Sequence, residues 1–152
     1  MITLKDIQTA VADMLKKNGY TVTANEVTQG FTKPTFFVDV LPVSTALQGK
    51  AYEMVTVSVE LTYFPEIETR EELVRMAENI KKIFLYESIP VQDRFLSTDE
   101  IVFDNENSTL LAYFEITFMQ ESGIQEKTYP KMKTLNTEVK QNNGTSTNNN
   151  SV

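Results

Sequence analysis

Residues 55–63 read VTVSVELTY, and apolar and polar side chains alternate along the whole stretch. Successive side chains of a β-strand point to opposite faces of its sheet, so this alternation predicts a long strand with one apolar and one polar face. The apolar face requires a covering layer. The polar face holds four residues that we expect to face solvent or another subunit: Thr56, Ser58, Glu60 and Thr62.

Two amphipathic helices can supply the covering layer. Thr3 and Asp6 form a capping-box pattern ahead of apolar residues spaced three and four apart, and Gly19 follows the end of this helix. Thr69 and Glu72 form the same pattern ahead of a second apolar series with helical spacing. We therefore expect two helices that pack on one face of a sheet.

The remaining extended segments complete the predicted sheet. Residues 20–27 alternate as a half-buried strand, and residues 35–41 are an almost continuous apolar run that suits a central strand. We expect Pro42 to end this run before a connecting loop. Residues 91–103 and 109–119 read as two further strands joined by a polar turn. The predicted fold class is α+β, with a mixed, mainly antiparallel sheet of about four to five strands and two helices on one face.

The composition excludes most familiar hydrolase and metalloenzyme chemistries. The 152 residues contain no cysteine and no histidine, which removes Ser-His-Asp and Cys-His nucleophile pairs, thiolate or imidazole zinc sites and histidine-ligated haem. The acidic residues lie in strand, turn or first-helical-turn positions that have structural explanations. Residues 104–115 have a loose calcium-loop spacing, but Thr109 occupies the position that requires glycine, and a hairpin turn fits better. We predict no catalytic, cofactor or metal site and no enzyme activity.

Charge divides the chain into two parts. Residues 1–124 contain 10 basic and 19 acidic side chains, a net charge of −9, whereas residues 125–152 contain 4 and 2, a net charge of +2. We expect one domain over residues 1–124 and a polar, Lys- and Asn-rich extension over residues 125–152 that is disordered in the free subunit. The acidic domain lacks the clustered cations that bind nucleic acid. The lysines of the extension are candidate contacts with a neighbouring subunit: Lys127, Lys131, Lys133 and Lys140.

Five stretches taken together resemble the tail terminator family of tailed bacteriophages and related phage-like particles. They are ITLKDIQTAVADMLKKNG, EVTQGFTKPTFFVDVLPVS, VTVSVELTYFP, EELVRMAENIKKIF and LLAYFEITF. The resemblance covers residues 1–124, and its most specific parts are the run at residues 30–38 and the Tyr-Phe-Pro at residues 63–65. These patterns concern the fold, and the family has no catalytic motif that could be carried over.

The resemblance implies a structural virion protein. A tail terminator forms a ring, expected to be a hexamer, at the head-proximal end of the tail tube, where it stops tube polymerisation and provides the interface to the neck or head. The implied partners are further copies of the chain, the tail tube protein, the tail sheath protein and neck or head-completion proteins. DNA is implied only as passing cargo in the central channel. The implied location is the virion tail, after assembly in the bacterial host cytoplasm.

Two alternatives stay open from the sequence. One is another ring-forming neck or head-completion protein, because such subunits share small α+β designs. The other is an enzyme that uses carboxylates and a divalent ion. No stretch approaches the ~20 apolar residues of a membrane span, and residues 1–15 do not read as a secretory signal, so we expect no membrane partner.

Overall fold

The computed structural model describes residues 1–24 and 30–125. Its elements are, in chain order, α1 (Leu4–Lys17), β1 (Val22–Thr23), β2 (Thr35–Gln48), β3 (Tyr52–Phe64), α2 (Arg70–Ile80), the π-helical turn η1 (Lys81–Leu85), β4 (Ile89–Val91), β5 (Arg94–Leu96), β6 (Ile101–Glu106) and β7 (Thr109–Glu121). The order in the main sheet is β1-β2-β3-β7-β6, and β4 pairs with β5 in a small hairpin. β1 runs parallel to β2, and the other pairs are antiparallel. The predicted α+β fold is confirmed.

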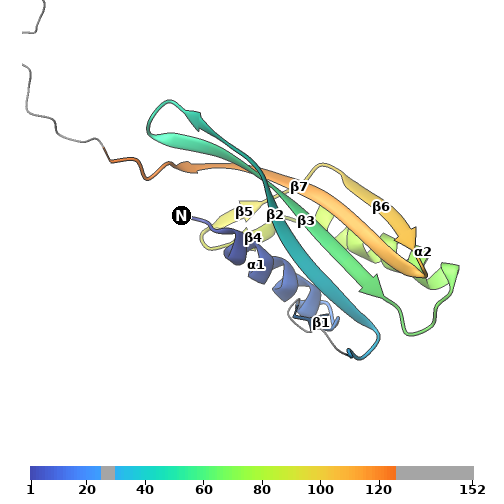
Figure 1. Ribbon diagram of the computed structural model, residues 1–152. Helices are drawn as coiled ribbons and strands as arrows, with labels where there is room; N and C mark the ends of the chain where they lie inside the picture. Colours follow the sequence, from blue (N-terminus) through green and yellow to red (C-terminus); the bar gives the residue numbers. More distant parts are fainter. Residues whose placement is uncertain (25–29, 126–152) are drawn as a thin grey trace, which may run out of the picture.

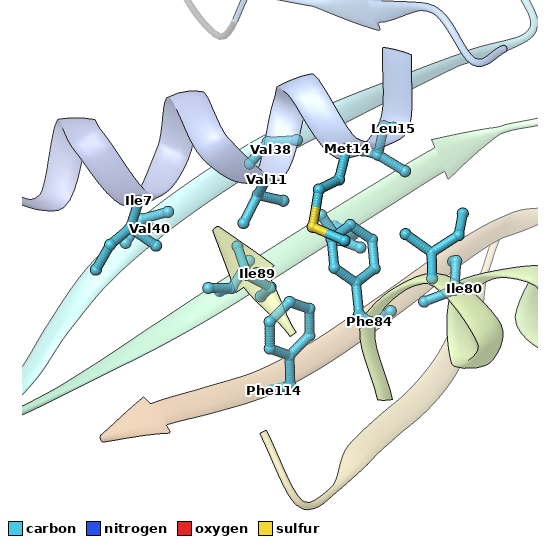
Figure 2. Close-up of a cluster of buried hydrophobic side chains, with 14 of the residues drawn as sticks. Ile7, Val11, Met14, Leu15, Val38, Val40, Ile80, Phe84, Ile89 and Phe114 are labelled. Carbon is cyan, nitrogen blue, oxygen red and sulfur yellow. The ribbon is translucent and has the colours of Figure 1, made fainter. Parts of the chain in front are cut away.

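The helices and the β4–β5 hairpin lie on one face of the main sheet (Figure 1). α1 packs along β2 and β4, and α2 packs against β7. The hydrophobic core lies between these layers. Phe84 of η1 stacks on Phe114 of β7 with ring centroids 5.4 Å apart, and Val11 of α1 and Ile89 of β4 point into the same cluster (Figure 2).

The first helix is fixed at its start by the predicted capping box. The Thr3 hydroxyl accepts from the Asp6 amide at 3.2 Å, and the Asp6 carboxylate accepts from the Thr3 amide at 2.8 Å. These bonds satisfy amides that have no partner within the helix, and they hold the pKa of Asp6 below its ordinary value. The helix then turns Ile7, Val11 and Leu15, all fully buried, towards the sheet.

β3 is the central strand of the sheet, and its two faces are those that the alternation predicts. Val57, Val59, Leu61 and Tyr63 are buried under the helices, and Val55 is half-buried. The four polar residues that alternate with them are half-buried on the opposite face. The apolar positions of β3 are matched across the sheet by Val38 and Val40 of β2 and by Phe114 and Ile116 of β7, so three strands build one continuous apolar surface.

β2 differs from its prediction, because it passes through Pro42 and continues to Gln48. The Phe36 amide donates to Thr21 O, away from β3, and Val38 O accepts from the Gln8 side chain. Alternate residues of a strand direct their backbone groups to the same edge, so the nitrogen of Pro42 also faces away from β3. The β2–β3 ladder therefore loses no donor there, as is usual for proline on an edge strand.

β2 is also not central, since β3 occupies the middle of the sheet and β1 covers only the start of β2. The register of the β2–β3 ladder shifts between Pro42 and Ser44, where β2 contains one extra residue. The segment that was expected to be a loop is the second half of a long hairpin.

Two other predicted boundaries are wrong. Residues 91–103 form parts of three strands, because Gln92 adopts φ +55° and turns the chain between β4 and β5. Within the described residues 20–24 of the predicted strand 20–27, only Val22–Thr23 form a strand, β1, and residues 25–29 lie outside the described part of the chain. The second helix ends at Ile80 and continues as the π-helical turn to Leu85.

Candidate assembly surface

The sheet face that points away from the helices is here called the outer face. In the described part of the chain, no helix lies over it (Figure 1). Cross-strand partners of an antiparallel ladder point to the same side, so the register defines its members. They include Phe37, Asp39 and Leu41 of β2, Thr56, Ser58, Glu60 and Thr62 of β3, Leu111, Tyr113, Glu115 and Thr117 of β7, and Val102, Asp104 and Glu106 of β6.

The four predicted residues of β3 lie in the middle of this face. The Thr56 and Thr117 hydroxyls are hydrogen-bonded across the strands at 2.9 Å. Ser58 pairs with exposed Glu115, and Glu60 has Asp39 on one side and Tyr113 on the other. The structure thus brings the predicted polar positions together. The other four predicted contacts, Lys127, Lys131, Lys133 and Lys140, lie outside the described residues.

The outer face is strongly acidic. It carries the carboxylates of Asp39, Glu60, Asp104, Glu106 and Glu115, and none of its described strand positions holds lysine or arginine. Asp39 and Glu60 are direct cross-strand partners, an arrangement of like charges that is unfavourable in an isolated sheet. The charge of this face is therefore uncompensated within the described subunit.

The carboxylates of the outer face affect the pKa of Tyr113. Its partial burial raises the pKa of Tyr113 above the ordinary value, and the negative charges of Glu60, Asp104 and Glu106 raise it further. A neutral hydroxyl and an aromatic ring therefore lie among carboxylates. Leu41, Leu111 and Val102 add apolar area to the same face, so it combines negative charge with groups that can be buried in a protein contact.

The acidic residues do not form a recognisable chemical centre. Among the described residues, no group of three or more carboxylates has the geometry of a metal site. The segment with loose calcium-loop spacing is a β-hairpin, in which Asn107 and Ser108 both adopt positive φ and connect β6 to β7. Positive φ at both central residues is the usual geometry of a two-residue hairpin turn, and the predicted turn is confirmed.

An aromatic cluster lies at the end of the outer face where β2 begins. The ring of Phe31 is 5.1 Å from that of Phe37 and 4.7 Å from that of Phe64, and these two are 5.4 Å apart. Phe31 is 37% exposed. Adjacent strand residues point to opposite faces, so a buried Phe36 already required Phe37 to point outward, and this signal could have located the cluster.

At the opposite end of the sheet, the second half of the β2–β3 hairpin projects beyond α1 together with the end of β7 (Figure 1). Residues 43–54 are here called the arm. Several of its apolar residues are exposed, among them Val43, Leu47 and Tyr52. The arm is a continuation of the main sheet, because β3 stays paired with β2 on one side and with β7 on the other down to Tyr52.

A polar network joins α2 to β3 on the helix side of the sheet. The Tyr63 hydroxyl donates to Glu72 at 2.7 Å, and Arg75 donates to the same carboxylate at 3.0 and 2.6 Å. Burial raises the pKa of Tyr63, and the hydrogen bonds from Arg75 lower that of Glu72. The three side chains line a cavity of about 370 Å³. Their mutual pairing indicates that they anchor the helix to the sheet.

One comparison with known proteins identifies a family. A family described as "Phage tail terminator protein" matches residues 6–130. No curated protein matches the sequence. One solved structure is 11% identical and superposes with a TM-score of 0.45 over 86% of this chain and 100% of its own. Within the described residues, no helix is long and apolar enough to cross a membrane.

Proposed function

This chain belongs to the phage tail terminator family, and we propose that it forms a hexameric ring on the head-proximal end of the tail tube. In that position the ring stops tube polymerisation and provides the surface to which the neck or head attaches. Family membership also indicates a structural component of a phage tail and not an enzyme. An end cap has to match the rotational symmetry of the tube, which favours a closed ring of identical subunits.

The observation that carries the proposal, beside the family, is the outer face. An open sheet face that combines apolar side chains with uncompensated carboxylates is a costly surface for an isolated subunit. A neighbouring subunit that buries the apolar side chains and brings cations to the carboxylates would offset this cost. We therefore assign Thr56, Ser58, Glu60 and Thr62 to a surface that faces a neighbour or the channel.

The basic extension is the second proposed contact. Lys127, Lys131, Lys133 and Lys140 give residues 125–152 a positive balance that complements the acidic domain. Each exposed ion pair contributes roughly 0–1 kcal/mol, so a single extension binds weakly. A ring that presents several tethered copies at once multiplies these weak contacts.

The same charge pattern suits a conduit for DNA. A channel lined by carboxylates repels the phosphate backbone, so DNA passes without binding to the wall. The proposed protein partners are the tail tube protein, the tail sheath protein where a sheath exists, and neck or head-completion proteins. The proposed location is the head-proximal end of the virion tail.

The test is to remove the protein from particle assembly and to locate it in complete particles. Without it, we expect tubes of uncontrolled length that do not join to heads, and resupply of the chain should restore uniform tails. Electron microscopy of labelled particles should place the protein at one end of the tube. Label along the whole tube would refute the proposal, and label confined to the head vertex, with tube length unaffected, would identify another neck or head-completion protein.

A further inference from the structure

The arm exposes apolar residues on both of its faces. Leu47 pairs with Glu53 and points to the helix side, whereas Tyr52, paired with Gln48, points to the outer side. Leu47 is 56% exposed because α1 covers the helix side of the sheet only up to the start of the arm (Figure 1), and Tyr52, on the open outer side, is 47% exposed. A narrow β-ribbon of this kind gains stability when another layer covers one of its faces.

The arm also differs in charge from the rest of the domain. Residues 43–51 of the arm carry Lys50 in the turn as their one charged side chain, and Glu53, the one carboxylate of the arm, accepts from the Gln120 side chain at 3.0 Å. Ser122 holds the backbone of this turn, since its amide donates to Ala51 O at 2.9 Å and its hydroxyl donates to Lys50 O at 2.6 Å. Among the described residues, Lys50 forms no ion pair. The arm therefore presents an unpaired cation beside exposed apolar groups.

The outer face is complementary to the arm in charge. It carries carboxylates without cations, and Leu41 and Tyr113 lie between them. The arm cannot reach the outer face of its own subunit, because it continues the same three paired strands and points away from the domain. Contact between the two surfaces thus requires two copies of the chain.

We propose that the arm of each subunit lies across the outer face of the next subunit, with Leu47 against the sheet and Lys50 among the carboxylates around Glu60. The inference rests on the proposed ring, for which it supplies the contact between subunits. Because the arm and the outer face are different surfaces, the contact is head-to-tail. Such a contact repeats from subunit to subunit and closes into a ring when the rotation between neighbours permits. Stacked sheets pack about 10 Å apart, so side chains of the two surfaces would interdigitate.

Cross-linking in purified particles tests the contact directly, since the natural chain has no cysteine. The variant carries Leu47→Cys on the arm and Thr117→Cys on the outer face, and the particles are treated with a flexible bis-maleimide. We expect a ladder of covalent dimers and higher oligomers on a denaturing gel. The control pairs Leu47→Cys with Val74→Cys, which lies on α2, and should give no ladder. No ladder from the first pair, or an equal ladder from both pairs, would overturn the proposal.

A second measurement uses two residues of equal exposure. Leu47 and Val74 are both 56% exposed, but only Leu47 lies on the arm. Leu47→Asp should reduce the number of subunits incorporated per particle about tenfold or more, as loss of a central apolar contact does. Val74→Asp should leave incorporation unchanged, and thermal unfolding of the free subunits checks that both variants are folded.

The two measurements separate this inference from the proposed function. If Leu47→Asp subunits are incorporated like unchanged subunits and still cap the tube, the arm contact is wrong and the terminator role stands. If the unchanged chain is absent from the end of the tube, the terminator role itself fails, and the contact proposed here fails with it.

Discussion

Replacing Val57 with aspartate places a carboxylate in the centre of the core. Val57 is fully buried on the helix side of β3, between Pro42 of β2 and Ile116 of β7. Losing its burial costs about 1.5–3 kcal/mol, and burying an unpaired polar group in its place costs roughly 2–7 kcal/mol more. The free energy of unfolding of a small domain is about 5–15 kcal/mol. We therefore expect Val57→Asp to lower the free energy of unfolding by at least about 3.5 kcal/mol, a large part of the stability of a small domain.

The matched control is Glu60→Lys, a charge change on the other face of the same strand. Asp39 lies directly opposite Glu60, so the substitution replaces a repulsive pair by an attractive one. Cross-strand pairs contribute about 0.2–1 kcal/mol, and the stability should stay the same or rise slightly. Urea unfolding followed by circular dichroism measures both variants. A Val57→Asp subunit within about 1 kcal/mol of the unchanged protein would refute the assignment of the two faces, given the minimum cost of a buried polar group.

Three further predictions concern assembly, pH and the extension. Glu60→Lys subunits should fold but assemble poorly or hinder DNA passage, which particle yield and infectivity or DNA delivery would measure; normal values for both would remove Glu60 from the assembly surface. The folded-state pKa of Glu72 lies below its ordinary value of 4.5, so the unfolded chain binds more protons in acid and the free energy of unfolding falls as the pH drops below about 4.5. Glu72→Gln should reduce this pH dependence of the free energy of unfolding, measured by urea unfolding at several pH values. An unchanged pH dependence would contradict the Tyr63–Glu72–Arg75 network. Deleting residues 135–152 should leave folding intact but make attachment to the particle faulty or sensitive to salt; normal particles at every salt concentration would show that the extension is passive.

Local patterns were enough to predict β3 and α1. The alternation over residues 55–63 determines which side chains of the strand point to the buried face. The Thr3–Asp6 capping box is formed by residues close together in the chain. The path of β2 was not predictable in this way. Whether Pro42 interrupts a strand depends on which edge its nitrogen faces, and that follows from the pairing with β3 and not from the residues around it.

The composition of the outer face was predictable only in part, for a related reason. The polar positions of β3 could be recognised from their own strand, but their neighbours could not, because membership of the outer face depends on the register of four strands. Leu41 ends the apolar run of residues 35–41, and only the ladder places it beside Ser58, as it places Tyr113 beside Glu60. The turn at Gln92 contains neither glycine nor asparagine, so the sequence did not indicate that residues 91–103 belong to three separate strands.

The double pairing of β3 has a mechanical consequence. Its backbone is bonded to β2 and β7 along nearly its whole length, and in antiparallel ladders these bonds lie perpendicular to the strands. A force applied to the arm along the strand axis therefore loads many bonds in shear at the same moment, and the strands cannot peel apart one bond at a time. A subunit gripped by its arm would transmit tension through the sheet to the opposite end of the domain, where Tyr63 is tied to Glu72 of α2.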